Sequence, residues 1–567
     1  MNSNQTVFAF ITAACLALAS QPAARAQTVT IYRNANVHTL SDPPRAEAIA
    51  VIGDSIWAVG TEAHVRAVVR ASGHGDAAEV DLGGATVLPG LIDAHGHMVG
   101  LGALGSGVMD LRGTTSYDAV IGMVKQRADQ LPPGAWVIGR GWDHESWPEK
   151  ELPHHTRLSE AVPENPVWLA RVDGHAGLAN AAAMRAAGID ERTVSPQGGE
   201  VLRDESGRPT GVFVDAAEEL VGRAVPSVLR GSTEELILRA QAMCLEKGLT
   251  GVHDAGVSER EIDVYKRLER EGKLKIRVYA MVHGAEAEGY FRADGAYEGE
   301  RLSVRSAKYY IDGAMGSRGA WLLGPYADRP TGPGGVAYTG LNVIDVSEVE
   351  AAARAGRELN YQVCVHAIGD RGNREVLDSI ERAFNGDVAL MRAARFRVEH
   401  AQLLSPSDIP RFGEMGVIAS MQPTHCTSDM RWVDARVGTE RAKGAYAWAS
   451  LLRTGATLAF GSDFPVESHD PLLGFFAGVT RQNADMEPSG GWHAEQRLTR
   501  EECLHAFTAG AAFAGFMEDR VGVLRPGMMA DFIALDRDLL TCEPAEVTGA
   551  RVLLNVISGE AVFDGRN

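Results

Sequence analysis

Two histidines placed two residues apart are the first sign of chemistry in this sequence. His95 and His97 end a short apolar run that starts at Val87, in the segment VLPGLIDAHGHM. Side chains alternate between the two faces of an extended strand, so residues two apart point the same way and both imidazoles can reach one metal ion. The two histidines can equally well be ordinary polar residues at a strand end beside a turn. A metal site therefore needs further evidence from the sequence.

Support comes from four more polar residues that lie in or at the end of other strand-like runs, namely Lys308, His366, His400 and Asp463. Each has a plain structural alternative. Lys308 can pair with Asp312, either histidine can be a hydrogen-bonded core residue, and the aspartate can cap the turn that follows it. The joint occurrence of all these positions favours a metal site over a set of separate structural roles.

Short apolar runs alternate with helical patterns along the chain, as a (β/α) barrel requires. One predicted helix covers 347–359, with Ser347 as its N-cap, and another covers 374–384. The interval from 98 to 236 is too long for one crossover, so it is expected to form an insertion over the barrel mouth. The eight predicted strands are Val87–Asp93, Gly251–Asp254, Ile276–Val282, Ala307–Ile311, Gln362–His366, Arg395–His400, Val417–Gln422 and Thr457–Ser462.

The two ends of the chain carry a different pattern. Residues 28–86 contain several short alternating runs separated by Gly and Asp, which is typical of β-hairpins. The segments MADFIALD and RVLLNVISGEAVFDG near the C-terminus have the same character. The sequence therefore predicts strands at both ends, outside the barrel.

Eight motifs spread over nearly all of the chain after residue 27 carry a resemblance to a known family. They are VLPGLIDAHGH (87–97), GWDHESW (141–147), RVDGHAGLAN (171–180), AKYYIDGAMGSRGA (307–320), VCVHAIGDRGN (363–373), RVEHAQ (397–402), MQPTHCTSDM (421–430) and FGSDFPVE (460–467). With these motifs the sequence resembles the amidohydrolase superfamily, and more narrowly amidohydrolase family 3, the group of N-substituted formamide deformylase-like metal-dependent hydrolases.

The resemblance implies a fold and a domain organisation. The fold is α/β, a (β/α)8 TIM-like metallo-hydrolase barrel over residues 87–518 with a large insertion after barrel strand 1 (98–236) above the active site. A small β-sandwich domain would form from both chain ends, residues 27–86 and 519–567.

The resemblance also implies two divalent metal ions, one held by His95, His97 and Asp463, the other by His366 and His400, with Lys308 as the bridge. An unmodified ammonium has no lone pair and repels cations, so this role requires a carbamylated Lys308, formed with carbon dioxide. Zn²⁺ suits imidazole and carboxylate ligands best, and Mn²⁺, Fe²⁺ or Co²⁺ also fits. Asp463 would act as the catalytic general base and then as the general acid.

Four residues outside the ligand set are predicted to face the substrate: His175, His425, Trp142 and Arg318. A hydrogen bond within an Asp-Gly-His turn explains His175 almost as well, and a solvated loop charge explains Arg318 equally well. The chain departs from the family pattern at Asp215, where related sequences often carry a longer acid.

Composition limits the classes of partner. The formal net charge of the 567 residues is −19, so nucleic acid is not an expected partner and a small-molecule substrate is. The five cysteines after residue 26 include no Cys-x-x-Cys pair, which excludes a disulfide framework. A homodimer is expected only because it is the commonest oligomeric state.

The first 26 residues are predicted to be a bacterial signal peptide. An apolar run from Val7 to Ala19 leads to an Ala-x-Ala cleavage pattern at 24–26. This run is too short for a stable membrane span, and no later stretch competes with it, so the mature protein is expected to be periplasmic or secreted. No Lys or Arg precedes the run, and the alternative is lipid attachment at Cys15.

The predicted function is metal-dependent hydrolysis of a C–N bond in a small-molecule amide that is not a peptide, with an N-substituted formamide or an acylated amine as the type of substrate. Two alternatives remain. A lactonase or cyclic-amide hydrolase would use the same site on another activated carbonyl. A non-catalytic periplasmic small-molecule binding or regulatory protein would keep the fold but would not need a general base.

Overall fold

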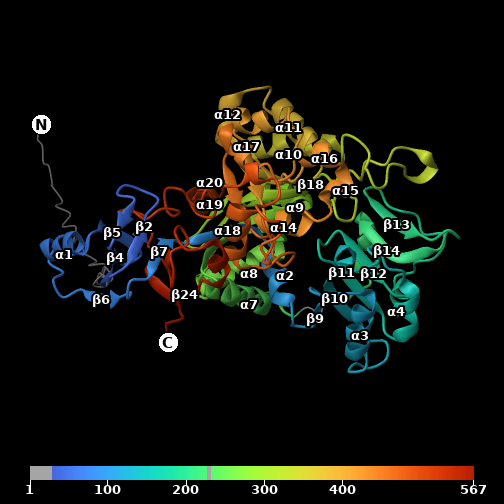
Figure 1. The fold of residues 1–567 in the computed structure, drawn as a ribbon, viewed down its shortest axis with the longest axis horizontal. Coiled ribbons are helices and arrows are strands. Elements are labelled where there is room, and N and C mark those ends of the chain that lie inside the picture. Colours follow the sequence, from blue (N-terminus) through green and yellow to red (C-terminus); the bar gives the residue numbers. More distant parts are fainter. Residues whose placement is uncertain (1–27, 227–230, 567) are drawn as a thin grey trace, which may run out of the picture.

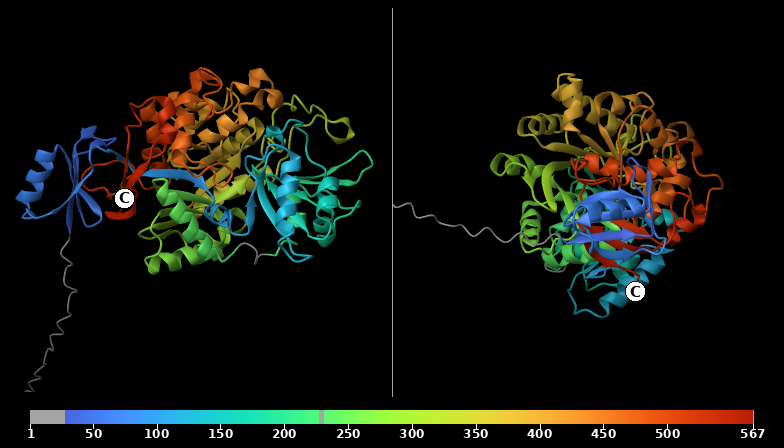
Figure 2. Two further views of the ribbon diagram at one scale, coloured as in Figure 1. Left: turned by 60° about the horizontal axis from the view of Figure 1, so that its bottom comes forward. Right: turned by 90° about the vertical axis from the view of Figure 1, so that its left-hand side faces the viewer.

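The computed structural model describes residues 28–226 and 231–566, and the predicted signal peptide lies outside these residues. Three parts follow one another along the long axis of the molecule (Figure 1). Two small sheets lie at one end, the barrel is in the centre, and the insertion lies at the other end, an arrangement that Figure 2 shows from two further sides. Within the described ranges, no helix combines the length and the apolar character needed to cross a bilayer.

The central part is a nearly closed barrel of eight parallel strands, which confirms the predicted (β/α)8 fold. The strands adjoin in the order β22-β21-β20-β19-β18-β16-β15-β8, and the short strand β17 (Tyr297–Glu298) pairs with β18 outside this path. The barrel strands are β8 (Leu91–Gly96), β15 (Leu249–Val257), β16 (Arg277–His283), β18 (Leu302–Tyr310), β19 (Gln362–Ala367), β20 (Arg397–His400), β21 (Ile418–Met421) and β22 (Leu458–Phe460). Apart from a few terminal positions, their residues are buried, as expected for parallel strands covered by helices.

The seam between the first and last barrel strands is closed by side-chain and loop hydrogen bonds. The Asp93 carboxylate accepts from the backbone N–H of Ser462 (3.0 Å), from the hydroxyl of Ser462 (2.6 Å) and from the N–H of His95 (3.1 Å). The N–H of Asp463 donates to the His95 carbonyl over 2.7 Å. Closure of the barrel and placement of two predicted metal ligands therefore depend on the same contacts.

Helices cover the outside of the barrel and begin where the sequence supplies N-caps. Ser232 and Ser258 form capping boxes at the starts of α7 (Thr233–Glu246) and α8 (Glu259–Arg270). The predicted cap at Ser347 is wrong, because Asp345 accepts from the N–H of Ser347 and starts α10 (Val346–Leu359). The helix predicted at 374–384 begins earlier, as α11 (Asp370–Ala383), so its first turn directly follows the strand that carries His366.

Two small sheets lie beside the barrel, the first built from N-terminal strands alone and the second from strands of both chain ends. The first has the order β5-β4-β1-β6 and the second β25-β24-β23-β7-β2-β3. One hydrophobic cluster joins them, because Tyr32 and Ile49 pack with Phe532 and Leu554. The strands are β1 (Val29–Arg33), β2 (Asn36–His38), β3 (Arg45–Ala46), β4 (Ala48–Ile52), β5 (Ser55–Gly60), β6 (Ala78–Asp81), β7 (Thr86–Pro89), β23 (Phe532–Leu535), β24 (Val552–Ile557) and β25 (Glu560–Asp564).

The single strand predicted at 87–93 is in fact two strands that belong to different sheets. β7 ends at Pro89 in the second small sheet, and β8 begins at Leu91 in the barrel. A Cβ atom at Gly90 would lie 2.3 Å from the hydroxyl oxygen of Thr250, so this position needs glycine. An apolar run that is continuous in sequence therefore serves two sheets in turn.

The insertion between β8 and α7 forms its own six-stranded sheet with the order β13-β14-β12-β11-β10-β9. A separate hydrophobic cluster, which includes Trp142 and Trp147, packs this sheet against α3 (Tyr117–Ala128) and α4 (His155–Ala161). The strands are β9 (Val108–Asp110), β10 (Val137–Trp142), β11 (Val167–Arg171), β12 (Ala176–Ala179), β13 (Gly199–Arg203) and β14 (Pro209–Asp215). The insertion is thus a folded unit with its own core.

Candidate functional site

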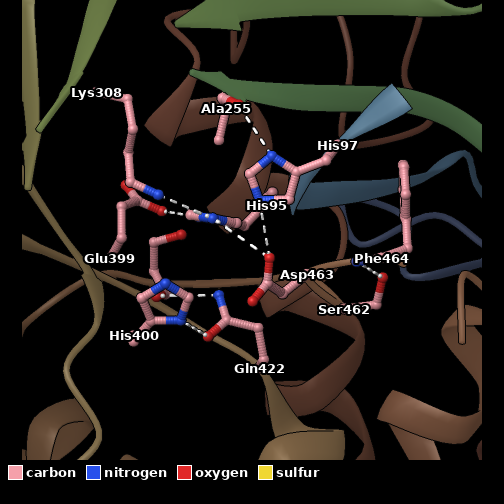
Figure 3. Close-up of polar contacts among 12 residues, drawn as sticks. His95, His97, Ala255, Lys308, Glu399, His400, Gln422, Ser462, Asp463 and Phe464 are labelled. Carbon is pink, nitrogen blue, oxygen red and sulfur yellow. Dashed lines mark hydrogen bonds and ion pairs between the residues drawn. The ribbon is translucent and has the colours of Figure 1, made fainter. Parts of the chain in front are cut away.

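Three of the predicted metal ligands converge at the C-terminal ends of the barrel strands. Ligand atoms of His95, His400 and Asp463 all lie within 4.8 Å of one another, and the three residues are buried (Figure 3). The Nε2 atom of His97 lies 3.0 Å from Oδ1 of Asp463. Segments that are more than 300 residues apart in the sequence thereby form one cluster of imidazole and carboxylate donors.

Two of these residues have an unusual backbone conformation. His400, at the end of β20, has φ +74°, and Asp463, just after β22, has φ +59°. Non-glycine residues in this region cost roughly 1–3 kcal/mol each and are found mainly at functional sites. Both conformations turn the chain sharply at the strand end, where barrel active sites are built.

His95 is held by a buried ion-pair network. Its Nδ1 atom lies 2.5 Å from Oε2 of Glu399, and Arg397 donates to both carboxylate oxygens of this glutamate, from Nε (2.7 Å) and Nη2 (3.0 Å). Arg397 also donates to the Ala94 carbonyl and to the hydroxyl of Ser420. With the Nδ1 proton on the glutamate side, the lone pair of His95 is on Nε2, which faces the cluster.

Two further histidines have their orientation fixed in the same way. Nδ1 of His97 donates to the Ala255 carbonyl over 2.9 Å, and Nδ1 of His400 donates to Oε1 of Gln422 over 2.8 Å. Each contact leaves the Nε2 lone pair free for a metal ion.

His366 lies beside this cluster with an unused nitrogen. Its ring centroid is 4.5 Å from that of His400 and 4.9 Å from that of His175. Among the residues that the structure describes, its buried Nε2 atom has no hydrogen-bond partner. Such a buried, unsatisfied nitrogen costs about 1–3 kcal/mol, and a bound metal ion would remove this cost.

Lys308 is buried near the end of β18, so its side chain does not have to reach far. Nζ lies 3.1 Å from Nε2 of His95 and 4.6 Å from the centre of the Tyr310 ring. Burial lowers the pKa of Lys308 to about 8. The alternative role, a pair with Asp312, is not formed, because this carboxylate instead accepts from the backbone N–H groups of Ile368 and Gly369.

The electrostatics of the cluster suit metal binding. Burial lowers the pKa of His95 to about 4 and the pKa values of His366 and His400 well below the usual range, so these imidazoles are neutral at pH 7. Burial acts to raise the pKa of Asp463, but hydrogen bonding to His97 holds it well below its usual range. Neutral imidazoles, one carboxylate and a lysine open to carbamylation form a set that fits divalent metal ions.

Two cavities of about 480 and 520 Å³ meet at the cluster. Both are lined by His175, His366, His400 and Asp463. The first cavity extends between the insertion and the loop after β21, and the second contains His95, His97 and Lys308. Their size is that of small-molecule sites.

His175 reaches the site from the insertion and is held by Asp215. Its Nδ1 atom lies 2.7 Å from Oδ1 of Asp215, and the N–H of Asp215 donates to the His175 carbonyl over 3.1 Å. Asp215 has φ +49°, and its carboxylate lies against Gly313 and Gly319, where a Cβ atom would come within 2.3 Å of Oδ2. Asp215, first noticed as a departure from the family pattern, therefore positions this histidine. Burial alone lowers the pKa of His175, but Asp215 outweighs it and the pKa is raised.

The other three predicted substrate-facing residues have different environments. His425 lines the first cavity; its Nδ1 accepts from Nε2 of Gln402, and its Nε2 lies 3.6 Å from Oδ2 of Asp463. The structure places Trp142 in the core of the insertion, where its indole N–H donates to the Leu169 carbonyl over 2.8 Å. Arg318 pairs with Asp328 over 2.9 Å and lines neither cavity. Of the four residues, only His175 and His425 line one of these two cavities and can therefore contact a substrate.

Sequence reasoning missed the residues that orient the ligands. Arg397 and Glu399 stand two apart in the RVEHAQ motif, on the same face of β20. Two opposite charges two residues apart in a short predicted strand were a signal, because buried charges need partners or a ligand. Gln422 gave no comparable signal.

Comparisons with known proteins agree with this geometry. The model of the amidohydrolase family matches residues 78–563. The chain is 34% identical over 540 residues to the protein LONG AFTER FAR-RED 3 of Arabidopsis thaliana, covering 92% of this chain and 89% of that protein. It is 29% identical over 551 residues to the N-substituted formamide deformylase of Arthrobacter pascens, covering 93% and 96%.

A solved structure supports the same placement. The crystal structure of an uncharacterised metal-dependent hydrolase from Pyrococcus horikoshii matches with a TM-score of 0.72 and 28% sequence identity. The match covers 91% of this chain and 99% of that one, so it includes the small sheets and the insertion as well as the barrel.

Proposed function

The chain belongs to the amidohydrolase family and is a metal-dependent hydrolase, and on that premise we propose that it cleaves a non-peptide C–N bond in a small-molecule amide. The observation that carries this proposal is the buried cluster of His95, His400 and Asp463 at the meeting point of the two cavities. The similarity to an N-substituted formamide deformylase supports a formamide or another acylated amine as the substrate.

In this proposal the barrel holds two divalent metal ions, one on His95, His97 and Asp463 and the other on His366 and His400, with Lys308 between them. Zinc suits this donor set best. The bound ions would supply hydroxide near neutral pH and polarise the substrate carbonyl. The unsatisfied Nε2 of His366 supports a second ion beyond the three-residue cluster.

Lys308 is proposed to act as a carbamate. Its neutral amine attacks carbon dioxide and loses a proton, which gives an anionic oxygen ligand in place of a cation. A pKa of about 8 leaves a substantial share of the amine neutral at physiological pH, as this reaction requires.

Asp463 is proposed as the catalytic residue. Its carboxylate takes the proton of the attacking water and later gives it to the departing amine. His175 and His425 line the same cavity as Asp463, and they are proposed to donate hydrogen bonds to the oxygen of the tetrahedral intermediate.

The test combines metal analysis with a substrate panel. We expect two metal equivalents per chain, a carbon dioxide adduct in the native mass that is lost in Lys308→Ala, and turnover of N-substituted formamides or N-acetylated amines. Turnover of lactones with none of amides would replace the amide proposal by a lactonase. One metal equivalent without the adduct would remove the bridging role of Lys308.

Export and assembly are separate proposals. We expect the mature protein to begin at Gln27 in the periplasm or outside the cell, which N-terminal sequencing of protein from each cell fraction would test.

A homodimer in solution is expected, and light scattering at several concentrations would test it.

A further inference from the structure

A β-bulge in β10 separates the side chains of Arg140 and Trp142. The pairing of β10 with β11 shifts between these residues, and Gly141 has φ +104°. A Cβ atom at Gly141 would lie 2.6 Å from Cγ of Arg112, so the position needs glycine. On a regular strand residues two apart share a face, but here Trp142 enters the insertion core and Arg140 lines the second cavity. The bulge thus directs one guanidinium toward the metal-ligand cluster.

Arg140 uses little of its hydrogen-bonding capacity within the protein. Nη2 donates to the Val172 carbonyl over 3.3 Å, and within residues 28–226 and 231–566 the buried Nε has no partner. Two other arginines of the insertion, which line the first cavity, are fully engaged. Arg112 pairs with Asp110 at 2.6 Å, and Arg171 pairs with Asp143 at 2.8 Å. Arg140 differs from both, because no ion pair among the described residues includes it.

As far as the structure describes the chain, the electrostatic environment of Arg140 lacks a close anionic partner. Desolvation lowers the pKa of Arg140, and the more distant carboxylates of Asp463, Asp173 and Glu218 only partly offset this effect. A guanidinium removed from water without close partners is costly, and it presents five N–H donors in a fixed plane. A planar carboxylate can accept two of them in parallel.

We propose that Arg140 is the carboxylate-binding residue of a substrate subsite, so that the preferred substrates are amides with a carboxylate close to the scissile C–N bond, such as N-acylated amino acids. This inference rests on the proposed amide hydrolysis and narrows its substrate class. Arg140 shares a cavity of about 520 Å³ with His95, His97 and Lys308, so a substrate of amino-acid size spans from one to the other.

A monoanion fits this subsite better than a phosphate. The second cavity is also lined by Asp173, Asp215 and Glu218, and Arg140 is the only arginine among its lining residues in the described part of the chain. A phosphate dianion would meet more repulsion from these carboxylates than a carboxylate would, with the same single guanidinium as its partner.

The experiment compares two formamides that differ only in the carboxylate, N-formylphenylalanine and N-formyl-2-phenylethylamine. We expect the metal-loaded enzyme to favour the first in kcat/KM, and Arg140→Gln to reduce this preference by about 10- to 100-fold, mainly through KM, as for a lost charged hydrogen bond. Arg140→Lys, which keeps the charge but not the planar fork, should retain part of the preference. Arg157→Gln, at an exposed position of α4 that lines neither cavity, is the matched control and should keep the preference within about threefold.

Two outcomes would overturn the proposal. If Arg140→Gln lowers kcat/KM for both formamides by the same factor, Arg140 only compensates nearby carboxylates and the proposal is wrong. If this variant leaves kcat/KM for both formamides unchanged, the proposal is wrong as well.

A binding measurement decides the proposal even without turnover. By calorimetry, 3-phenylpropionate should bind the metal-loaded wild type about 10-fold more tightly than Arg140→Gln, and equal affinity would overturn the subsite. If neither formamide is hydrolysed while this difference is present, the amide hydrolysis proposal fails and the carboxylate subsite stands.

Discussion

The barrel and the insertion contribute to the same site in different ways. In the barrel, His95, His97 and His400 are each oriented by a hydrogen bond from their second ring nitrogen, and the Arg397–Glu399 pair behind His95 is completely buried. In the insertion, Asp215 holds His175 at the cavity surface, whereas Arg140 has almost no partner. The difference indicates two roles. The three barrel histidines, which are proposed metal ligands, are held by hydrogen bonds within the protein, whereas side chains of the insertion keep hydrogen-bonding groups free for the substrate.

The strongest test of the barrel is Asp463→Asn. Because the amide neither accepts a proton at this step nor binds a cation as well as a carboxylate does, we expect kcat/KM to fall by at least about 10³-fold. Steady-state kinetics with metal analysis of the purified variant would check this. Activity within tenfold of the wild type would assign the proton transfer to another residue.

Glu399→Gln tests the hydrogen-bond network that orients His95 and does not alter a residue proposed to take part in the reaction. It leaves the buried guanidinium of Arg397 without its carboxylate, so we expect about 3–5 kcal/mol less stability and about 10- to 100-fold weaker metal binding. Denaturant unfolding and competition with a chelator measure the two effects.

Glu145→Gln is the matched control, because Glu145 pairs with the equally buried Arg436 outside the ligand cluster. It should destabilise the protein without weakening metal binding. Equal metal loss in both variants would show that general unfolding, not the orientation of His95, causes the loss.

Asp215→Asn tests the contribution of the insertion to the site. We expect roughly a tenfold loss of kcat/KM with unchanged metal content, because His175 loses its orienting carboxylate while the barrel ligands stay in place. The pKa of His175, raised by Asp215, should also fall, which ¹H–¹⁵N NMR of the histidine rings would show. Asp204→Asn, in the turn between β13 and β14, is the control, and a metal loss in Asp215→Asn would contradict the division of roles.

The last prediction is a pH dependence of stability that has opposite sign in the two regions. His95 has its pKa lowered from 6.5 to about 4, so the unfolded chain binds more protons between these values. The metal-free protein should therefore lose about 1.4 kcal/mol of stability per pH unit for each such histidine as the pH falls below 6.5.

His175, with its raised pKa, stabilises the protein below its unfolded value, and this contribution is lost as the pH rises through the folded value. Urea unfolding of metal-free protein between pH 5 and 7 would measure the free energy of unfolding, to which the two groups of histidines contribute with opposite sign. His400→Asn should flatten the dependence and His175→Asn should steepen it. A flat profile in the wild type would contradict neutral, buried barrel histidines.

The convergence of His95, His400 and Asp463 could be predicted because each lies at or just after the end of a predicted strand, and parallel strands bring their C-terminal ends to one edge. The break at Gly90 was missed because β7 and β8 are both apolar, although the Pro89-Gly90 pair between them is a turn signal. Trp142 was predicted to face the substrate from its motif in the insertion, but after the bulge at Gly141 it lies in the insertion core, and Arg140 lines the second cavity instead. Long-range pairs such as His175 with Asp215 depend on the register of the insertion sheet, which local patterns do not determine.

The seam at Asp93 has a consequence for the order of assembly during synthesis. Asp93 and its partner Ser462 are separated by 369 positions, and His95 and Asp463 flank the same contact. At about 5–20 residues per second, roughly 20 to 75 s pass between the synthesis of the first ligand strand and that of the last. For that interval the growing chain carries histidines without the carboxylate that completes their site. The complete cluster therefore assembles only after the last barrel strand has joined the first.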